Sequence, residues 1–182
     1  GENYRFGCRA AGTPEDLRRF GLETCVVPPV LYGGRPVSST RIRECVREGK
    51  VGLARRLLGR PFQLEGGVAH GFQVGRKLGF PTVNLAVEPG LLLPARGVYV
   101  TETALPEGVF RAVTNVGSRP TFTQADIVSV ESYLLGFSGD LYGREVQVRF
   151  LKYLRPERPF ESAQALSQQI ARDVRAALDW RG

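Results

Sequence analysis

The sequence predicts a mainly β fold: a six-stranded antiparallel β-barrel with a carboxy-terminal helix, preceded by a shorter α/β segment. From Gly59 onward, short stretches rich in Val, Phe, Tyr and Thr alternate with turns such as LPEGV and SGDLYG. Their regular spacing favours an antiparallel barrel over residues 61 to 154. The last twenty-odd residues have helical periodicity.

The expected strands of the barrel follow one another closely. They are FQLEGGVAHGFQV, PTVNLAV, GVYVTETAL, VFRAVTNVG, IVSVESYLLGF and REVQVRFLKYL, with residues 97 to 116 forming a hairpin. In FESAQALSQQIARDVRAALDW, one helical face carries apolar side chains at Ala163, Leu166, Ile170, Val174 and Ala177. We expect that face to pack against the barrel.

The first 58 residues read as α/β. TCVVPPVLY predicts a short strand stopped by Pro28 and Pro29. SSTRIRECVREG opens with hydroxyl side chains suited to an N-cap and predicts a helix that ends at Gly49. A second helix, over residues 51 to 58, is closed by Gly59.

Composition excludes several classes of protein. The 182 residues can form one large or two small domains, and the 42% hydrophobic content is ordinary for a globular protein. No apolar run reaches the ~18 residues of a membrane span, and the amino terminus lacks a signal-peptide core, so we expect a cytoplasmic protein without a membrane partner. Cys8, Cys25 and Cys45 form no C-x-x-C pair, which argues against disulfides and zinc.

The net charge of +7 is compatible with a nucleic acid, a nucleotide substrate or a solvated arginine-rich surface. The cations are scattered and do not alternate with aromatic residues, so we expect no nucleic-acid partner. Because the chain starts at Gly1 and contains no methionine, we expect it to be a piece of a longer protein. The composition leaves the oligomeric state open.

One glycine-rich stretch, GFQVGRKLGFPTVN, carries the first chemical signal. Gly71, Gly75 and Gly79 surround Arg76 and Lys77, which suits the binding of a polyphosphate. The stretch matches neither a Walker A loop nor a Gly-x-Gly-x-x-Gly fingerprint. The alternative is a hairpin loop with solvated cations.

Three side chains farther along could carry chemistry. Thr82 and Asn84 are two residues apart, so in an extended segment both neutral oxygens face one side and could bind Mg²⁺ together with ATP phosphates. The alternative for this pair is a turn that enters a strand. Glu131 lies in the apolar strand VSVESYLLGF, where it is either an exposed partner of an arginine or a buried group with a raised pKa suited to a general base.

Six ordered motifs carry a resemblance to a known family. GFQVGRKLGFPTVNL, LPARGVYV, NVGSRPTF, VESYLLGFSGDLYG, YLRPERPF and the terminal helix resemble, in order and spacing, the riboflavin kinase domain of bacterial bifunctional riboflavin kinase/FAD synthetases. The resemblance covers residues 59 to 182, which we expect to form the riboflavin kinase domain. Val83 replaces the alanine of the family's Pro-Thr-Ala-Asn box.

The resemblance implies ATP-dependent phosphorylation of riboflavin to FMN, with Mg²⁺ as cofactor. Glu131 would take the proton from the ribityl 5′-hydroxyl as it attacks the γ-phosphate, and Thr82 and Asn84 would hold Mg²⁺. The implied ATP contacts are Gly71, Arg76, Thr82, Leu134, Gly136 and Tyr142, and the implied flavin contacts are Arg155 and Arg158, for which a solvated surface role is the alternative. The rival interpretation is a non-catalytic barrel that binds flavin or nucleic acid.

Residues 1 to 58 resemble the carboxy-terminal part of the same family's FMN adenylyltransferase domain, truncated. GENYRFG resembles its Gly-x-Asp-Phe-x-Phe-Gly stretch with Asn3 in place of Asp, and SSTRIR resembles its phosphate-contacting motif, implying contacts by Ser38, Ser39, Thr40 and Arg43. The full-length protein would therefore also make FAD. That reaction needs an upstream His-x-x-His signature, and His70 is the only histidine, so we expect no FAD synthesis from this chain alone.

Overall fold

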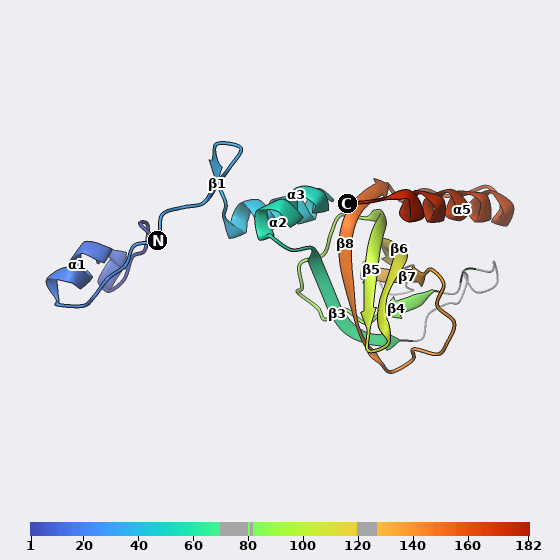
Figure 1. The fold of residues 1–182 in the computed structure, drawn as a ribbon, viewed down its shortest axis with the longest axis horizontal. Helices are drawn as coiled ribbons and strands as arrows, with labels where there is room; N and C mark the ends of the chain where they lie inside the picture. The colour runs from blue at the N-terminus through green and yellow to red at the C-terminus, as the bar shows by residue number, and fades with distance from the viewer. Residues whose placement is uncertain (70–79, 81, 120–126) are drawn as a thin grey trace. The chain divides into compact units, whose positions relative to one another are not determined.

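The structure, a computed structural model, describes residues 1–69, 80, 82–119 and 127–182. These residues form two compact units, Gly1–Arg41 and Ile42–Gly182. The larger unit contains the barrel and the carboxy-terminal helix (Figure 1).

The smaller unit has little regular structure. It contains the 3₁₀ turn η1 (Cys8–Ala10), the helix α1 (Pro14–Arg19) and two strands, β1 (Leu31–Tyr32) and β2 (Arg35–Pro36), which pair as an antiparallel ribbon. The strand predicted for TCVVPPVLY is therefore wrong over residues 24–30, which belong to no strand. Two consecutive prolines remove two backbone donors from this segment, so a ladder cannot form through it.

Two short helices precede the barrel, as the sequence predicts. They are α2 (Ser39–Arg47), which buries Cys45 and Val46, and α3 (Val51–Leu58), which buries Val51, Ala54 and Leu57. Gly59 ends α3 in the left-handed conformation with φ 74°, which a glycine adopts without steric cost.

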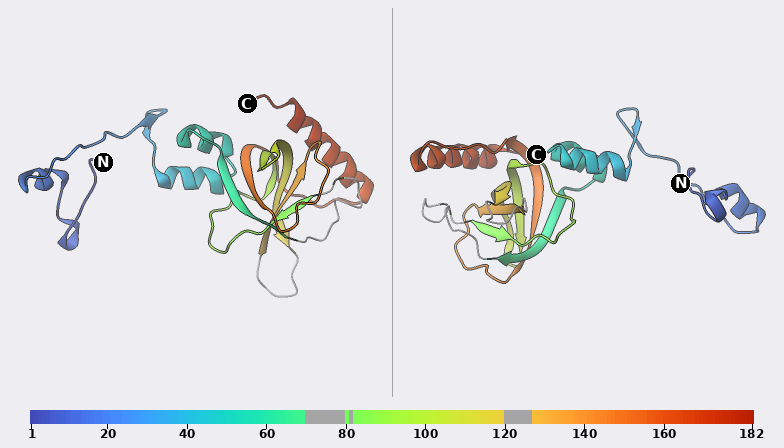
Figure 2. Two further views of the ribbon diagram at one scale, coloured as in Figure 1. Left: turned by 60° about the horizontal axis from the view of Figure 1, so that its bottom comes forward. Right: turned by 180° about the vertical axis from the view of Figure 1, so that it is seen from behind.

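Six strands close into an antiparallel barrel (Figures 1 and 2), which confirms the predicted fold. They are β3 (Phe62–Ala69), β4 (Val83–Leu85), β5 (Gly97–Leu105), β6 (Gly108–Arg119), β7 (Ile127–Leu134) and β8 (Glu145–Arg155), in the order β3-β4-β7-β6-β5-β8. The predicted hairpin is β5 and β6, with Gly97 opposite Val116 and Leu105 opposite Gly108.

The interior of the barrel combines an apolar core with a chain of buried hydroxyls. Tyr99 and Phe150 are fully buried in this core, and their rings meet edge to face at 5.2 Å. The hydroxyls of Thr101 and Thr114 lie 2.7 Å apart, and those of Thr114 and Ser132 lie 2.8 Å apart. Because Thr114 bridges β5 to β7 in this way, these bonds fix the strands on which the candidate site is built.

The helix α5 (Ala163–Asp179) packs on the outside of the barrel against β5 and β6, as predicted (Figure 2). The Ser162 hydroxyl caps it by accepting a hydrogen bond of 3.1 Å from the Ala165 backbone amide. Ala177 and Val174 contact an outward-facing apolar cluster of the barrel, formed by Val98, Val100, Val113 and Leu151. Within the described ranges, no helix is long and apolar enough to cross a membrane.

Candidate active site

Three polar side chains lie in a row across the outer face of the barrel. Glu131 in β7 is the register partner of Asn84 in β4 and of Asn115 in β6. Directly opposed residues of antiparallel strands have Cβ atoms about 5 Å apart on the same face. The carboxylate of Glu131 is therefore flanked by two amide side chains, and this arrangement is set by strand register.

Two residues of the row, Glu131 and Asn115, line a cavity of about 460 Å³ between the barrel and α5, here called the helix-side cavity. One wall is aromatic, with the rings of Phe80 and Tyr133 in edge contact at 5.4 Å. A second wall, on α5, is apolar and includes Leu166 and Ile170. Most of the remaining lining residues are polar or charged: Thr82, Asn115, Glu131, Arg155, Glu157, Arg158, Ser162 and Asp173. The others are Pro159 and Phe160 in the segment after β8, Ala163 at the start of α5, and Val98 and Val113 of the barrel.

Two arginines enter this cavity from the end of β8 and the segment that follows it. Arg155 is paired with Asp173 of α5 at 2.8 Å, and their side chains are only 18% and 6% exposed. Arg158 is exposed and donates to the side-chain oxygen of Gln169 at 2.7 Å. A solvated surface role is thus wrong for Arg155, because its guanidinium is held inside the cavity wall.

Glu157 lies flat against β6. Its Oε1 accepts a hydrogen bond of 3.2 Å from Asn115 Nδ2. A Cβ atom on Gly117 would lie 2.1 Å from the same oxygen, so the carboxylate occupies the space above this glycine. Gly117 therefore permits Glu157 to reach Asn115, next to Glu131.

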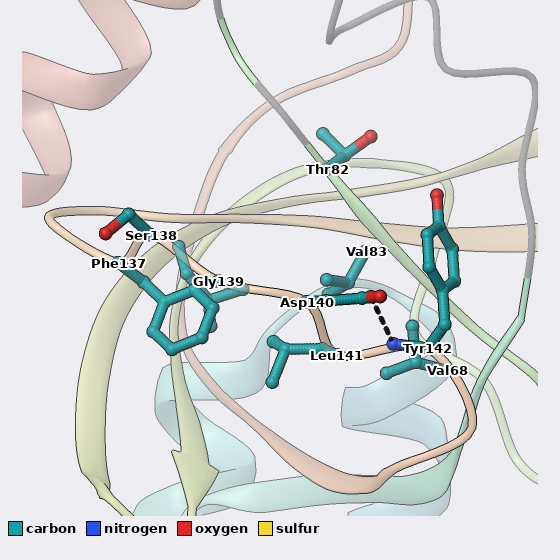
Figure 3. Close-up of a pocket in the computed structure, with 10 residues that line it drawn as sticks. Val68, Thr82, Val83, Phe137, Ser138, Gly139, Asp140, Leu141 and Tyr142 are labelled. Atoms are coloured by element: carbon teal, nitrogen blue, oxygen red, sulfur yellow. Dashed lines mark hydrogen bonds between the residues drawn. The ribbon is translucent and has the colours of Figure 1, made fainter.

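A second cavity, of about 580 Å³, opens beside β4 and the turn after β7, and is here called the turn-side cavity (Figure 3). In the view of Figure 3, the Thr82 hydroxyl and the Tyr142 ring lie above Leu141 and Val68. Asp140 stabilises the turn by accepting a hydrogen bond of 2.9 Å from the Tyr142 backbone amide. Val83, Leu134, Phe137, Ser138 and Gly139 complete the lining.

Thr82 lines both cavities. It is next to Val83, which faces the barrel core, so Thr82 and Asn84 both project from the outer face of the β4 segment. A group bound in the turn-side cavity and a group bound in the helix-side cavity would therefore approach each other at Thr82.

The structure brings together most of the residues expected from the sequence. Glu131, Thr82, Arg155 and Arg158 share the helix-side cavity, while Leu134 and Tyr142 join Thr82 in the turn-side cavity. Gly136 lines neither cavity; it is an exposed turn residue with φ 73°. Asn84 is 5% exposed and also lines neither cavity. Gly71 and Arg76 lie outside the described residues.

No residue of the adenylyltransferase-like motif lines either cavity. Its four residues, Ser38, Ser39, Thr40 and Arg43, are all exposed. The Ser38 hydroxyl accepts a hydrogen bond of 3.3 Å from the Arg41 backbone amide, which is the geometry of a helix N-cap.

Sequence reasoning missed several residues of the helix-side cavity. Asp173 lies on the apolar stripe of α5, at helical spacing from Ile170 and Ala177, and a carboxylate at such a position is a detectable signal of a buried partner. Asn115 and Glu157 lie within motifs used for the family resemblance, but only the fold shows that they meet.

The side-chain oxygens of Thr82 and Asn84 suit a metal cation whose charge is balanced mainly by the phosphates of a bound substrate. Thr82 and Asn84 offer neutral oxygens, and among the described residues no group of three or more His, Cys, Asp or Glu could hold a metal ion. Mg²⁺ is commonly held by one or two protein oxygens together with substrate phosphates. These residues therefore fit a metal that arrives with a polyphosphate.

Comparison with known proteins identifies the family. The riboflavin kinase (flavokinase) family matches residues 58–181, and the chain belongs to this family. Members are ATP-dependent enzymes that take riboflavin and ATP as substrates, and ATP-dependent phosphotransfer generally needs a divalent metal.

Two curated relatives carry the name bifunctional riboflavin kinase/FMN adenylyltransferase. The relative from Escherichia coli strain K12 is 36% identical over 187 residues, covering 100% of this chain and 59% of its own. The relative from Listeria monocytogenes is 31% identical over 176 residues, covering 95% of this chain and 56% of its own. The chain thus spans a little over half the length of these relatives.

A solved structure from Streptococcus pneumoniae has the same fold. It superimposes with a TM-score of 0.92 at 35% identity, covering 100% of this chain and 59% of that one. Its title describes a macrolide-efflux protein. The share covered is the same as for the E. coli relative.

Proposed function

We propose that this chain transfers the γ-phosphate of ATP to the 5′-hydroxyl of riboflavin, giving FMN and ADP. The observation that carries the proposal is that Thr82 lines both cavities, with Glu131 in the helix-side cavity beside it. Phosphoryl transfer mainly requires two substrates in line and a neutralised phosphate charge. Two cavities that meet at one residue support the first requirement, because a substrate in each would approach the other at Thr82.

Riboflavin has a flat, largely apolar ring system and a polar ribityl chain. The helix-side cavity matches it, with aromatic and apolar side chains on two walls and polar side chains on the rest of its lining. The isoalloxazine ring would lie between the Phe80–Tyr133 pair and the apolar face of α5. The ribityl hydroxyls would face Asn115, Glu157 and Glu131. Arg155 and Arg158 would contact the flavin.

ATP would occupy the turn-side cavity. Leu134 and Tyr142 would contact the nucleotide, and Gly136 would allow the turn after β7 to reverse direction close to it. Gly71 and Arg76, outside the described residues, would lie near the phosphates.

Glu131 would act as the general base. It is partly buried on the outer face of β7, and strand register places it directly opposite Asn84. A carboxylate within hydrogen-bond reach of an attacking hydroxyl can accept its proton as the new bond forms. No other proton acceptor is required for this reaction.

Thr82 and Asn84 would hold Mg²⁺ through their side-chain oxygens. The metal, when bound with ATP, would neutralise charge on the transferred phosphate. Asn84 is buried, so its amide is held in one orientation by the surrounding strands. The neutral oxygens add no negative charge that would repel the phosphates.

Residues 1–58 would be the carboxy-terminal part of an FMN adenylyltransferase domain, and residues 59–182 the kinase domain. Ser38, Ser39, Thr40 and Arg43 would contact phosphate only when the rest of that domain is present, and the longer protein would also make FAD. A cytoplasmic location and the absence of a nucleic-acid or membrane partner stay predictions.

The test is to incubate the purified chain with riboflavin, ATP and Mg²⁺ and to separate the flavins by chromatography. We expect FMN, and we expect its formation to stop when the metal is chelated. A chain that binds riboflavin but forms no FMN would support a non-catalytic flavin-binding module instead. The same chromatogram, repeated with FMN as substrate, should show no FAD.

A further inference from the structure

Asp173 is a charged residue on the apolar face of α5, at helical spacing from Ile170 and Ala177. It lies in the middle of α5, on the face that packs toward the barrel, and its side chain is 6% exposed. A carboxylate in such a position must be paired, because an unpaired buried charge is strongly destabilising. Its partners therefore indicate what this charge is for.

Those partners are the side chains that enter the helix-side cavity. Arg155 Nε donates to both carboxylate oxygens at 3.1 Å, and Nη2 donates to Oδ2 at 2.8 Å. Such a two-point contact fixes the guanidinium plane as well as its position. The third nitrogen, Nη1, donates to the Pro156 carbonyl at 3.1 Å, which ties the start of the following segment to the same group.

The same carboxylate also reaches the second arginine. Gln169, one turn earlier in α5, donates from Nε2 to Asp173 Oδ1 at 2.9 Å and accepts from Arg158 Nη2 at 2.7 Å. Both guanidinium carbons lie near the face of Phe160, at 5.7 Å for Arg155 and 5.1 Å for Arg158. One carboxylate on α5 thus orders the two cations, both of which contact the ring of Phe160.

We propose that Asp173 is a positioning residue for the flavin substrate: it holds Arg155 directly, and Arg158 through Gln169, in the orientation that the helix-side cavity presents to riboflavin. The inference rests on the proposed function, because it assigns riboflavin to this cavity. Without Asp173, Arg155 would be free to rotate, and fixing it again on binding would cost affinity. The turn-side cavity contains none of these residues, so ATP binding is not affected.

The test compares Asp173→Asn with Asp179→Asn, the same substitution at an exposed residue of the same helix. We expect Asp173→Asn to raise KM for riboflavin about tenfold, with KM for ATP unchanged. Quenching of riboflavin fluorescence, measured without nucleotide, should show the same loss of affinity. Asp179→Asn should behave as the wild type.

A second arm separates positioning from simple stabilisation. If Asp173 acts mainly through Arg155, then Asp173→Asn should raise KM for riboflavin by less in an Arg155→Gln chain than in the wild type, with only the part that passes through Gln169 and Arg158 remaining. The double variant should also melt at a higher temperature than Arg155→Gln alone, because Arg155→Gln leaves the buried carboxylate without its cation.

Two results would overturn the inference. One is an unchanged KM for riboflavin and unchanged quenching in Asp173→Asn with only a lower melting temperature, which would make the ion pair purely structural. The other is additive rises in the double variant, which would mean that Asp173 does not act through Arg155. If the wild-type chain quenches riboflavin fluorescence but forms no FMN, only the kinase proposal fails, because the quenching measurement still tests the role of Asp173. If the wild-type chain neither quenches riboflavin fluorescence nor forms FMN, both the kinase proposal and the role of Asp173 fail.

Discussion

Asn84 and Glu131 are directly opposed across the antiparallel pair of β4 and β7, with their side chains on the outer face of the barrel. Strand register alone therefore places the proposed metal ligand beside the proposed base. Asn115 flanks Glu131 on its other side in β6. The arrangement is rigid because the neighbouring inward residue, Ser132, belongs to the buried hydroxyl chain.

Removing either proposed metal ligand should change the metal dependence of the reaction. We expect Thr82→Val and Asn84→Ala each to raise the Mg²⁺ concentration for half-maximal rate by roughly tenfold or more. KM for ATP should rise as well, since the phosphate charge is less well neutralised. Initial rates measured over a range of Mg²⁺ concentrations give both quantities.

Riboflavin affinity without nucleotide serves as the control for these two variants. It should change little for Asn84→Ala, because Asn84 does not line the helix-side cavity, and less than the metal dependence for Thr82→Val, because Thr82 is one of many residues that line this cavity. Equal losses of riboflavin and ATP affinity would contradict the assignment and would indicate that the Pro-Thr-x-Asn box is a structural turn.

The barrel could be predicted because its signals are local. Alternating apolar residues and glycine or proline turns mark β5, β6 and β8 almost to the residue, and the stripe of Leu166, Ile170 and Ala177 marks α5. The strand expected in TCVVPPVLY does not form before Leu31, because its few apolar residues are followed at once by two prolines that cannot donate to a ladder. Strand order was not readable from the sequence, since β4 pairs with β7 only through closure of the barrel.

The residues of the candidate site can be read from the sequence only where they lie in local motifs. Thr82, Glu131 and Arg155 belong to motifs with a recognisable order, so the resemblance found them and the cavities contain them. The role proposed for Asp173 depends on its contact with Arg155, 18 residues away in the sequence, which no local pattern records. Asn115 and Glu157 likewise meet only because β6 and the segment after β8 are brought together.

The buried hydroxyl chain should contribute to stability. Thr114→Val keeps the shape of the side chain but leaves the hydroxyls of Thr101 and Ser132 without the partner that joins them. We expect a loss of about 1–3 kcal/mol in the free energy of unfolding, measured by urea denaturation. Thr40→Val, at an exposed residue of the smaller unit, should change it by less than about 0.5 kcal/mol.

Gly117→Ala should affect substrate binding more than folding. The new methyl group would occupy the position of Glu157 Oε1, so the flexible glutamate has to leave Asn115. We expect a severalfold higher KM for riboflavin with an almost unchanged melting temperature. A folded variant that retains wild-type KM would show that the contact of Glu157 with Asn115 has no role in binding the substrate, whereas a variant that unfolds would contradict the expectation that Gly117 matters more for binding than for folding.

Alkaline pH should destabilise the barrel through Tyr99. Burial raises the pKa of this phenol, which donates its hydrogen to the Ala95 carbonyl, so the folded state favours the neutral form. Its contribution is complete below the ordinary tyrosine pKa of about 10 and is lost as the pH rises above that value. Tyr99→Phe should be less stable than wild type at pH ~8, and the difference should shrink by pH ~11 in urea denaturation. A constant difference would contradict this account.

The most direct test of the account is the rate of FMN formation by Glu131→Gln, compared with wild type and with Glu88→Gln, the same change at an exposed loop residue. Glutamine keeps the shape of the side chain but cannot accept the proton of the ribityl hydroxyl. We predict a fall in kcat of at least about 100-fold for Glu131→Gln, with riboflavin binding retained and Glu88→Gln unaffected. Wild-type turnover by Glu131→Gln would contradict the central claim that this carboxylate, held between Asn84 and Asn115, is the general base.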